Sequence, residues 1–150
     1  MLRIATWNVA GTGKGAWAYV VSALPADIIL LQECRDPATY LPADVYGHSG
    51  PYICWEPNSD NRGKGIAIYT RGFPLASVPF LHYLGWAQVA DVTIRDGKVI
   101  RLINVHGEVK KHYYVTDTLH TIVNDRLPLM SCNTYLLLGG DLNERKSLIW

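Results

Sequence analysis

The sequence lacks the features that would assign it to a functional class at once. Fourteen Lys and Arg residues oppose thirteen Asp and Glu residues, so the formal net charge is only +1, and no overall electrostatic attraction to polyanions is expected. No apolar run approaches the length of a membrane span, and no basic region followed by a long apolar segment opens the chain. These absences predict a soluble, cytoplasmic protein in which any contact with nucleic acid is local.

Cysteine is also scarce. Cys34, Cys54 and Cys132 are an odd number, with neither the spacing of a zinc site nor the density of a disulfide framework, which favours a reducing compartment. There are no internal repeats or low-complexity tracts. The glycine-rich segment 11–15 lacks the Lys-Ser/Thr ending of a Walker loop, so that phosphate-binding motif is discounted.

What the sequence does contain is enough apolar material for one folded domain. Of its 150 residues 49% are apolar, with five Trp and nine Tyr, and a chain of this length buries roughly 70% of its unfolded surface. Two apolar runs, at 27–33 and 135–143, stop abruptly at polar residues. Such runs are typical of strands covered on both faces, so we predict two buried strands with polar tips.

The rest of the chain predicts a mixed α/β protein. Apolar positions at helical spacing indicate two helices, the first ended by Pro25, and an Asp-Gly pair between two apolar runs indicates a hairpin. The further predicted elements are strands at 2–8, 52–55, 65–70, 88–94 and 99–106 and helices at 17–24 and 116–130.

Polar side chains stand at the ends of three predicted core strands. Asn8, Glu33 and Asp141 each follow an apolar stretch, so one edge of a sheet could collect them. Asp141 and Asn143 would point the same way from an extended backbone, and a carboxylate beside a carboxamide can hold a hard cation and a phosphate oxygen together. Because a buried carboxylate without a partner is costly, Glu33 lies at a solvated strand end, pairs with a cation or binds a metal.

Five short motifs follow one another along the chain in a recognisable order. They are Thr6-Trp7-Asn8, Leu31-Gln32-Glu33, Gly65-Ile66-Ala67-Ile68, Asn104-Val105-His106 and Gly140-Asp141-Leu142-Asn143. The ordered set resembles the endonuclease/exonuclease/phosphatase superfamily. The resemblance implies an α/β fold in which a sandwich of two β-sheets is flanked by helices, a four-layer α/β/β/α arrangement, with phosphoester chemistry at one end.

The resemblance also implies roles for individual residues. Glu33 corresponds to the carboxylate that holds Mg²⁺, or alternatively Mn²⁺, with Asn8 nearby. Asp141 corresponds to the residue that orients or deprotonates the attacking water, and Asn143 to a hydrogen-bond donor to the phosphate. His106 matches a histidine near the scissile phosphate, where it would stabilise developing charge. A strand-end histidine satisfied by backbone is the alternative for His106.

Three further residues are candidates for substrate binding. The segment around Arg35 is similar to that of pancreatic-type deoxyribonuclease, in which the corresponding Arg reaches into the DNA minor groove. Lys64 and Tyr69 could add a local phosphate-binding patch. An Arg35 that is simply solvated or salt-bridged remains open.

The sequence also departs from the family. The family chain normally continues past the Gly-Asp-x-Asn strand to a late Asp and an Asp-His pair that complete the site, whereas this sequence stops at Trp150. We therefore expect 1–150 to be the N-terminal portion of such a domain, with weak activity by itself and with sheet edges left uncovered. The Asp and His residues that lie outside the corresponding segment, and so cannot replace the missing ones, are His48, His82, His112, Asp117 and His120.

Several interpretations follow from this departure. The chain is a fragment of a longer enzyme, or self-associates or pairs with a complementing chain, or is a short form that binds without cutting. The main hypothesis is a metal-dependent phosphodiesterase, a nuclease that acts on nucleic acid. The alternatives are a phosphatase or lipid phosphodiesterase of the same fold and a non-catalytic binding module that lacks the final Asp-His.

Overall fold

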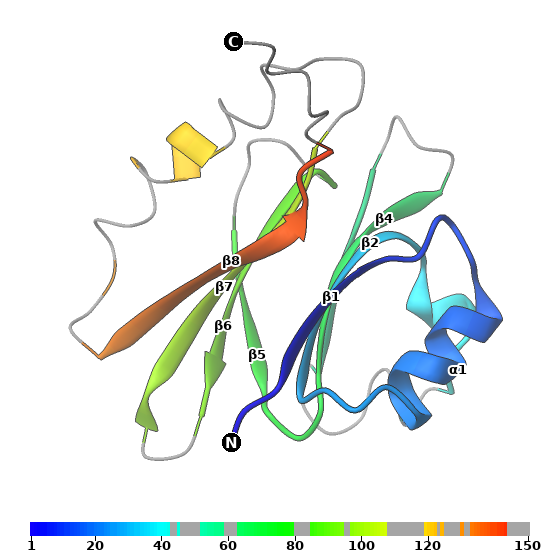
Figure 1. The fold of residues 1–150 in the computed structure, drawn as a ribbon, viewed down its shortest axis with the longest axis horizontal. Coiled ribbons are helices and arrows are strands. Elements are labelled where there is room, and N and C mark those ends of the chain that lie inside the picture. The colour runs from blue at the N-terminus through cyan, green and yellow to red at the C-terminus, as the bar shows by residue number, and fades with distance from the viewer. Residues whose placement is uncertain are drawn as a thin grey trace, which may run out of the picture.

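The fold is a sandwich of two four-stranded sheets, seen nearly edge-on in Figure 1. This computed structural model describes residues 1–42, 45, 52–58, 63–79, 85–94, 97–107, 119–122, 124, 130 and 133–143. Both sheets are mixed, because each joins one parallel pair of strands to antiparallel neighbours. The predicted α/β fold with two packed sheets is thereby confirmed.

The first sheet is built around two strands that are buried on both faces. Its order is β1-β2-β4-β3, with β1 parallel to β2 and the other pairs antiparallel. Helix α1 connects the parallel pair and covers the outer face of the sheet with Trp17 and Val20. A single turn of 3₁₀ helix, η1, follows β2. The bounds are Ile4–Asn8 for β1, Lys14–Ser22 for α1, Ile28–Arg35 for β2, Pro37–Thr39 for η1, Ile53–Pro57 for β3 and Lys64–Thr70 for β4.

The second sheet has the order β5-β6-β7-β8, with β8 at its edge and parallel to β7. A parallel partner requires a crossover connection, and residues 119–122 within this connection are helical. Leu119 and Ile122 pack against the outer face of the sheet. The bounds are Leu75–Val78 for β5, Ala87–Thr93 for β6, Val99–His106 for β7 and Thr134–Asp141 for β8.

Alternation of side chains along the strands forms the core between the sheets. Ile28, Leu30 and Ile68 of the first sheet pack against Val92 and Leu102 of the second, and all five side chains are at most 2% exposed. Burial of this apolar surface is the main force that holds the two sheets together.

Most predicted elements are present with ends shifted by one or two residues. The hairpin of β6 and β7 pairs in continuous register from Ala87↔Val105 to Thr93↔Val99, although Asp96 in its turn lies outside the described residues. Strand β5, which lies between Pro74 and Pro79, was not predicted. Only part of the predicted helix 116–130 is described. No helix in the described part of the chain is long and apolar enough to cross a membrane.

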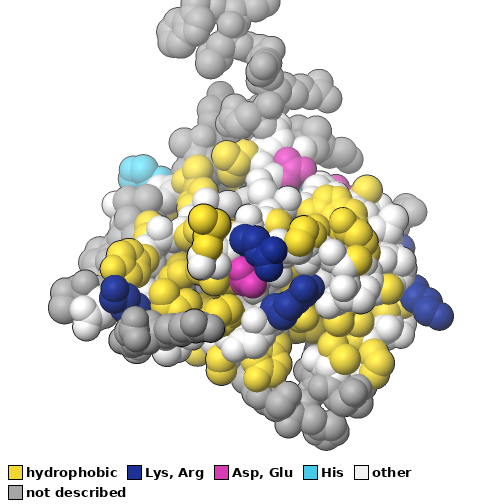
Figure 2. Space-filling view, turned by 60° about the horizontal axis from the view of Figure 1, so that its bottom comes forward, with side chains coloured by type: hydrophobic (Ala, Val, Ile, Leu, Met, Phe, Trp, Pro, Cys, Tyr) yellow, Lys and Arg dark blue, Asp and Glu magenta, His cyan; other side chains and the backbone are white. Residues whose placement is uncertain are grey.

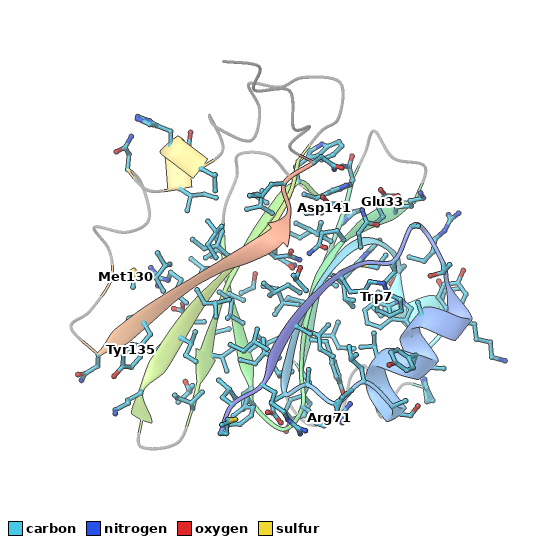
Figure 3. The ribbon with its side chains drawn as sticks, in the orientation of Figure 1. Trp7, Glu33, Arg71, Met130, Tyr135 and Asp141 are labelled. Atoms are coloured by element: carbon cyan, nitrogen blue, oxygen red, sulfur yellow. The ribbon has the colours of Figure 1, made fainter. Side chains whose placement is uncertain are left out.

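The prediction that the run at 135–143 forms a buried strand is wrong. Tyr135, Leu136 and Leu138 of β8 are 56%, 41% and 40% exposed. The physical reason is position, because β8 pairs with β7 on one side and has no strand neighbour on the other among the described residues. Tyr135 lies at the lower left of Figure 3, where β8 begins.

Candidate functional site

Four polar side chains from distant parts of the sequence meet at one end of the sandwich. Asn8 ends β1, Glu33 lies near the end of β2, and His106 and Asp141 end β7 and β8. The two parallel pairs place these strand ends on the same side of the molecule. Glu33 and Asp141 lie together at the upper end of Figure 3, far from Arg71 at the opposite end.

Asn8 joins the two carboxylates of the site. Its amide nitrogen Nδ2 donates to Asp141 Oδ2 at 2.8 Å and to Glu33 Oε1 at 3.2 Å. Its Oδ1 accepts from the Ala10 backbone N at 2.9 Å, which fixes the orientation of the amide. In this orientation Asn8 holds one carboxylate from each sheet in place with a single donor group.

A β-bulge directs Glu33 into the site. The pairing of β2 with β4 shifts register at this point, and Glu33 has a left-handed φ of +52°. Consecutive residues of a regular strand point to opposite faces, yet Gln32 contacts Asn104 and Glu33 faces His106, both in the second sheet. The bulge therefore turns two successive side chains toward the same layer, a strained conformation of the kind often found at functional sites.

A lysine contacts the other oxygen of Glu33. Lys64 Nζ lies 2.8 Å from Glu33 Oε2, with side-chain exposures of 23% and 25%. This hydrogen bond from the ammonium is the largest cause that holds the pKa of the Glu33 carboxyl below its usual value, against the raising effect of partial burial. Glu33 therefore carries a full negative charge at neutral pH.

His106 is held almost completely inside the protein. It is 5% exposed and stacks on the Trp86 ring, with centroids 5.1 Å apart. Burial lowers the pKa of the imidazole, although Glu33 and Asp141 act in the opposite direction. The site therefore favours a neutral imidazole, whose Nε2 lies 3.6 Å from Glu33 Oε1. The backbone N of His106 donates to Trp86 O at 2.8 Å.

Asn143 reaches the site by a turn. The strand ends at Asp141, and Asn143 has a left-handed φ of +49°, so the predicted extended backbone at this point is wrong. The Asn143 backbone N donates to Asp141 Oδ1 at 3.0 Å, and its Nδ2 donates to Gly107 O at 2.6 Å. This turn fixes the Asp141 carboxylate from a second direction.

A buried amide pair below the site was not predicted. Asn104 Nδ2 donates to the carbonyls of Leu31 and Ala67, each at 3.0 Å, and Asn104 Oδ1 accepts from Gln32 Nε2 at 2.7 Å. Asn104 thus ties β7 to both central strands of the opposite sheet. Gln32 and Asn104 both occur in the motifs named above. Each is a polar residue within an apolar run, and this pattern could have indicated a buried hydrogen bond. Trp86, which supports His106, had no comparable signal.

The structure places two of the three substrate-binding candidates at or beside the site and the third elsewhere. Lys64 lies in the site, and Arg35 Nε donates to Gly11 O at 3.4 Å beside it. Tyr69 does not lie there. It is 7% exposed, and it packs in the core on the α1 side of the first sheet. Tyr69 lies five residues after Lys64 in β4, and an odd separation along a strand places two side chains on opposite faces. The structure therefore does not bring Tyr69 together with Lys64 and Arg35.

The donor set fits a hard divalent ion. Mg²⁺ prefers oxygen ligands and needs only one or two protein carboxylates, since it keeps several waters. Glu33 and Asp141 both approach the single Nδ2 of Asn8, so their oxygens converge. No group of three or more His, Cys, Asp and Glu residues able to hold a metal occurs among the described residues. Carboxylate and amide oxygens are the donors that Mg²⁺ and Mn²⁺ prefer, whereas zinc sites are built mainly from Cys and His.

The opposite end of the sandwich, which comes forward in Figure 2, has a different character. In this view hydrophobic side chains cover much of the visible surface, and Lys and Arg side chains lie beside an acidic group at its centre. The carboxylate at this end, Asp27, accepts from the Arg3 backbone N at 2.8 Å and is already paired. A shallow pocket at this end is lined by Met1, Leu2, Asp27, Phe73 and Ile94.

Comparison with known proteins agrees with this geometry. The model of the Endonuclease/Exonuclease/phosphatase family matches residues 5–150. No curated protein sequence matches the chain. Among solved structures, the endonuclease domain of TRAS1, a telomere-specific non-LTR retrotransposon, is 17% identical with a TM-score of 0.64, covering 97% of this chain and 60% of that one.

Two other solved structures are similar. A humanized D. rerio TDP2 is 18% identical with a TM-score of 0.65, covering 97% of this chain and 63% of that chain. An AP endonuclease from Archaeoglobus fulgidus is 18% identical with a TM-score of 0.59, covering 95% and 58%. At these identities the likeness concerns the fold, and the chain spans 58–63% of the length of these three structures.

Proposed function

The chain belongs to the endonuclease/exonuclease/phosphatase family, and we propose that it is a Mg²⁺-dependent phosphodiesterase domain acting on nucleic acid. The observation that carries the proposal is the junction of Glu33, Asn8, Asp141 and His106 at one end of the sandwich. This junction offers oxygen ligands for a cation beside a neutral imidazole that can donate to an anion.

Glu33, with Asp141 beside it, would hold the divalent ion. When bound, the ion supplies a Lewis acid that polarises the phosphoryl group and stabilises its charge. Asn8 keeps the two carboxylates in place through hydrogen bonds, and its amide oxygen is engaged by the Ala10 backbone. Its proposed contribution is therefore orientation of the ligands.

Asp141 is the proposed base for the attacking water. Each carboxylate oxygen accepts one hydrogen bond, from Asn8 and from the Asn143 backbone, and each retains a lone pair for a further donor. A water that donates to this fixed carboxylate is oriented for attack and can lose its proton to it. Asn143 acts in the same proposal by holding the turn in place.

His106 is the proposed donor to the phosphoryl oxygens. Its stacking on Trp86 and its burial fix the ring and lower its pKa. A neutral imidazole donates one hydrogen bond without the cost of burying a second positive charge beside a metal ion. Such a donor stabilises the charge that develops as the phosphoester bond breaks.

Nucleic acid is proposed as the substrate on two grounds. Lys64 and Arg35 provide local positive charge beside the site on a protein with almost no net charge. Two of the similar structures are named as endonucleases. A phosphatase is the second candidate, because another similar structure, ANGEL2, is named as a 2',3'-cyclic phosphatase, at 14% identity and a TM-score of 0.59.

The test compares hydrolysis of supercoiled DNA, single-stranded RNA and a generic aryl phosphodiester by the chain, with Mg²⁺ and with EDTA. We expect slow, Mg²⁺-dependent cleavage of nucleic acid that Glu33→Gln reduces by on the order of a hundredfold or more. The matched control is Asp91→Asn, which neutralises a carboxylate of similar exposure, 24%, paired with Arg101 away from the site. Cleavage of the aryl ester alone would contradict a nuclease, and metal binding without any cleavage would support a binding module.

A further inference from the structure

Lys64 contacts the carboxylate that the proposed metal site would also use. Its ammonium contacts Glu33 Oε2 at 2.8 Å, while the other oxygen, Oε1, faces Asn8 at 3.2 Å and His106 at 3.6 Å. Lys64 is thus the direct cationic partner of the carboxylate expected to bind the ion. The pair is only partly exposed, so solvent screens it less than a surface pair.

The loop between β1 and α1 is shaped around this lysine. Gly11 has a left-handed φ of +75°, and a Cβ at this position would lie 2.3 Å from Lys64 Cε and 2.8 Å from Nζ. The Gly11 backbone N donates to Glu33 O at 2.9 Å. The same glycine therefore contacts the backbone of Glu33 and leaves room for the side chain of Lys64.

An ammonium and a divalent cation cannot both contact the same carboxylate oxygen without strong repulsion. Like charges a few ångströms apart repel, and a divalent ion repels an ammonium more strongly than a second unit charge would. Binding of the ion therefore favours movement of one of the two cations away from Glu33. Because lysine has a flexible stem with rotatable bonds, it is the lysine that can move.

We propose that Lys64 is an internal counter-cation that competes with the divalent ion for Glu33 and, when displaced, binds a phosphate oxygen of the substrate. The proposal rests on the proposed function of this site. Without the ion, Lys64 balances the charge of Glu33. With the ion, the ammonium loses its carboxylate partner and gains affinity for an anion at the same place.

This exchange makes binding of metal and binding of phosphate cooperative. The ion alone must displace Lys64 and leave it unpaired, which weakens metal binding. A phosphodiester gives the displaced ammonium a new partner, so it strengthens metal binding, and the ion strengthens phosphodiester binding by the same factor. The device would keep the site weakly loaded until substrate arrives.

The test measures Mn²⁺ affinity by calorimetry for the wild-type chain and for Lys64→Met, with and without dimethyl phosphate. We expect Lys64→Met to bind Mn²⁺ alone roughly tenfold more tightly, which corresponds to about 1.4 kcal/mol. We also expect dimethyl phosphate to increase Mn²⁺ affinity several-fold more in the wild type than in Lys64→Met. Lys98→Met, which removes an exposed lysine outside the site, controls for net charge.

Each outcome separates this inference from the proposed function. Equal Mn²⁺ affinity of wild type and Lys64→Met, or weaker binding by the variant, would overturn the inference and leave the metal site intact. No Mn²⁺ binding by either protein would overturn both. Lys64→Gln repeats the measurement with a polar side chain. If both variants misfold, the effect of dimethyl phosphate on the Mn²⁺ affinity of the wild type still tests the coupling. No effect on that affinity would contradict the inference.

Discussion

Strands β2 and β8 have similar sequences but different environments. Both contain a run of four consecutive large apolar or aromatic residues followed by a carboxylate within a few positions. In β2 the first five residues are buried, whereas no residue of β8 is buried. The difference comes from sheet position, because β2 lies between β1 and β4 while β8 has β7 alone as neighbour in the described part of the chain.

The two strands nevertheless deliver their carboxylates to the same site. Glu33 arrives through a bulge in a buried strand, and Asp141 arrives after two glycines in an exposed one. A Cβ at Gly140 would lie 1.8 Å from Val105 O, and one at Gly139 would lie 2.8 Å from Leu30 Cδ1. Burial of each strand therefore depends on its position in the sheet, whereas placement of its carboxylate depends on the bulge in β2 and on the two glycines in β8.

The largest expected effect tests the difference in burial. Leu30→Ala in β2 should lower the free energy of unfolding by about 2–5 kcal/mol, because it removes a side chain that is 1% exposed and leaves a cavity. Leu138→Ala in β8, where the side chain is 40% exposed, should cost less than about 1 kcal/mol. Urea unfolding followed by circular dichroism measures both, and equal costs would contradict the assigned burial.

A second prediction concerns the amide that links the sheets. Asn104→Leu should lower stability by about 1–3 kcal/mol, because Gln32 Nε2 loses its shorter hydrogen bond, keeping only the one to Thr6 Oγ1, and two buried backbone carbonyls lose a donor. The matched control is Gln88→Leu on the adjacent strand, opposite Asn104 in register.

Gln88 is fully buried, and its side-chain atoms have no hydrogen-bond partner in the described structure. Its replacement by leucine should therefore be neutral or stabilising. Chemical denaturation of the two variants in parallel separates a satisfied buried amide from an unsatisfied one. A larger loss in Gln88→Leu than in Asn104→Leu would contradict the hydrogen-bond assignment.

The sequence predicted what depends on local pattern. The motifs around Asn8, Glu33, His106 and Asp141 indicated the fold and identified these four polar residues as candidates for the site. It could not indicate the bulge at Glu33 or the exposure of β8, because both depend on which strands become neighbours. Tyr69 was misplaced for the same reason, since strand alternation decides a face only once the register is known.

The smallest expected effect is on acid stability. Because burial lowers the pKa of His106 below 6.5 in the folded protein, the unfolded chain binds a proton that the folded one does not, so stability falls as pH drops below 6.5. The depressed pKa of Glu33 adds a further loss below about 4.5.

The His106→Asn variant should therefore lose less unfolding free energy than the wild type between pH 7 and pH 5, the two slopes differing by less than about 1.4 kcal/mol per pH unit. Differential scanning calorimetry in matched buffers measures the slope. His120→Asn, which removes an exposed imidazole outside the site, is the control. An unchanged slope in His106→Asn would show that the buried imidazole does not contribute.

The most direct test of the account is paramagnetic broadening of backbone amide signals by Mn²⁺ in the NMR spectrum of the chain. If the proposed cation site lies where both sheets converge, substoichiometric Mn²⁺ should broaden the amides of Ala10, Glu33, Gly107 and Asp141 first. The amides of Asp27 and Lys98, at the other end of the sandwich, should stay sharp, and Glu33→Gln should abolish the selective effect. Uniform broadening, or broadening centred on Asp27, would contradict the account.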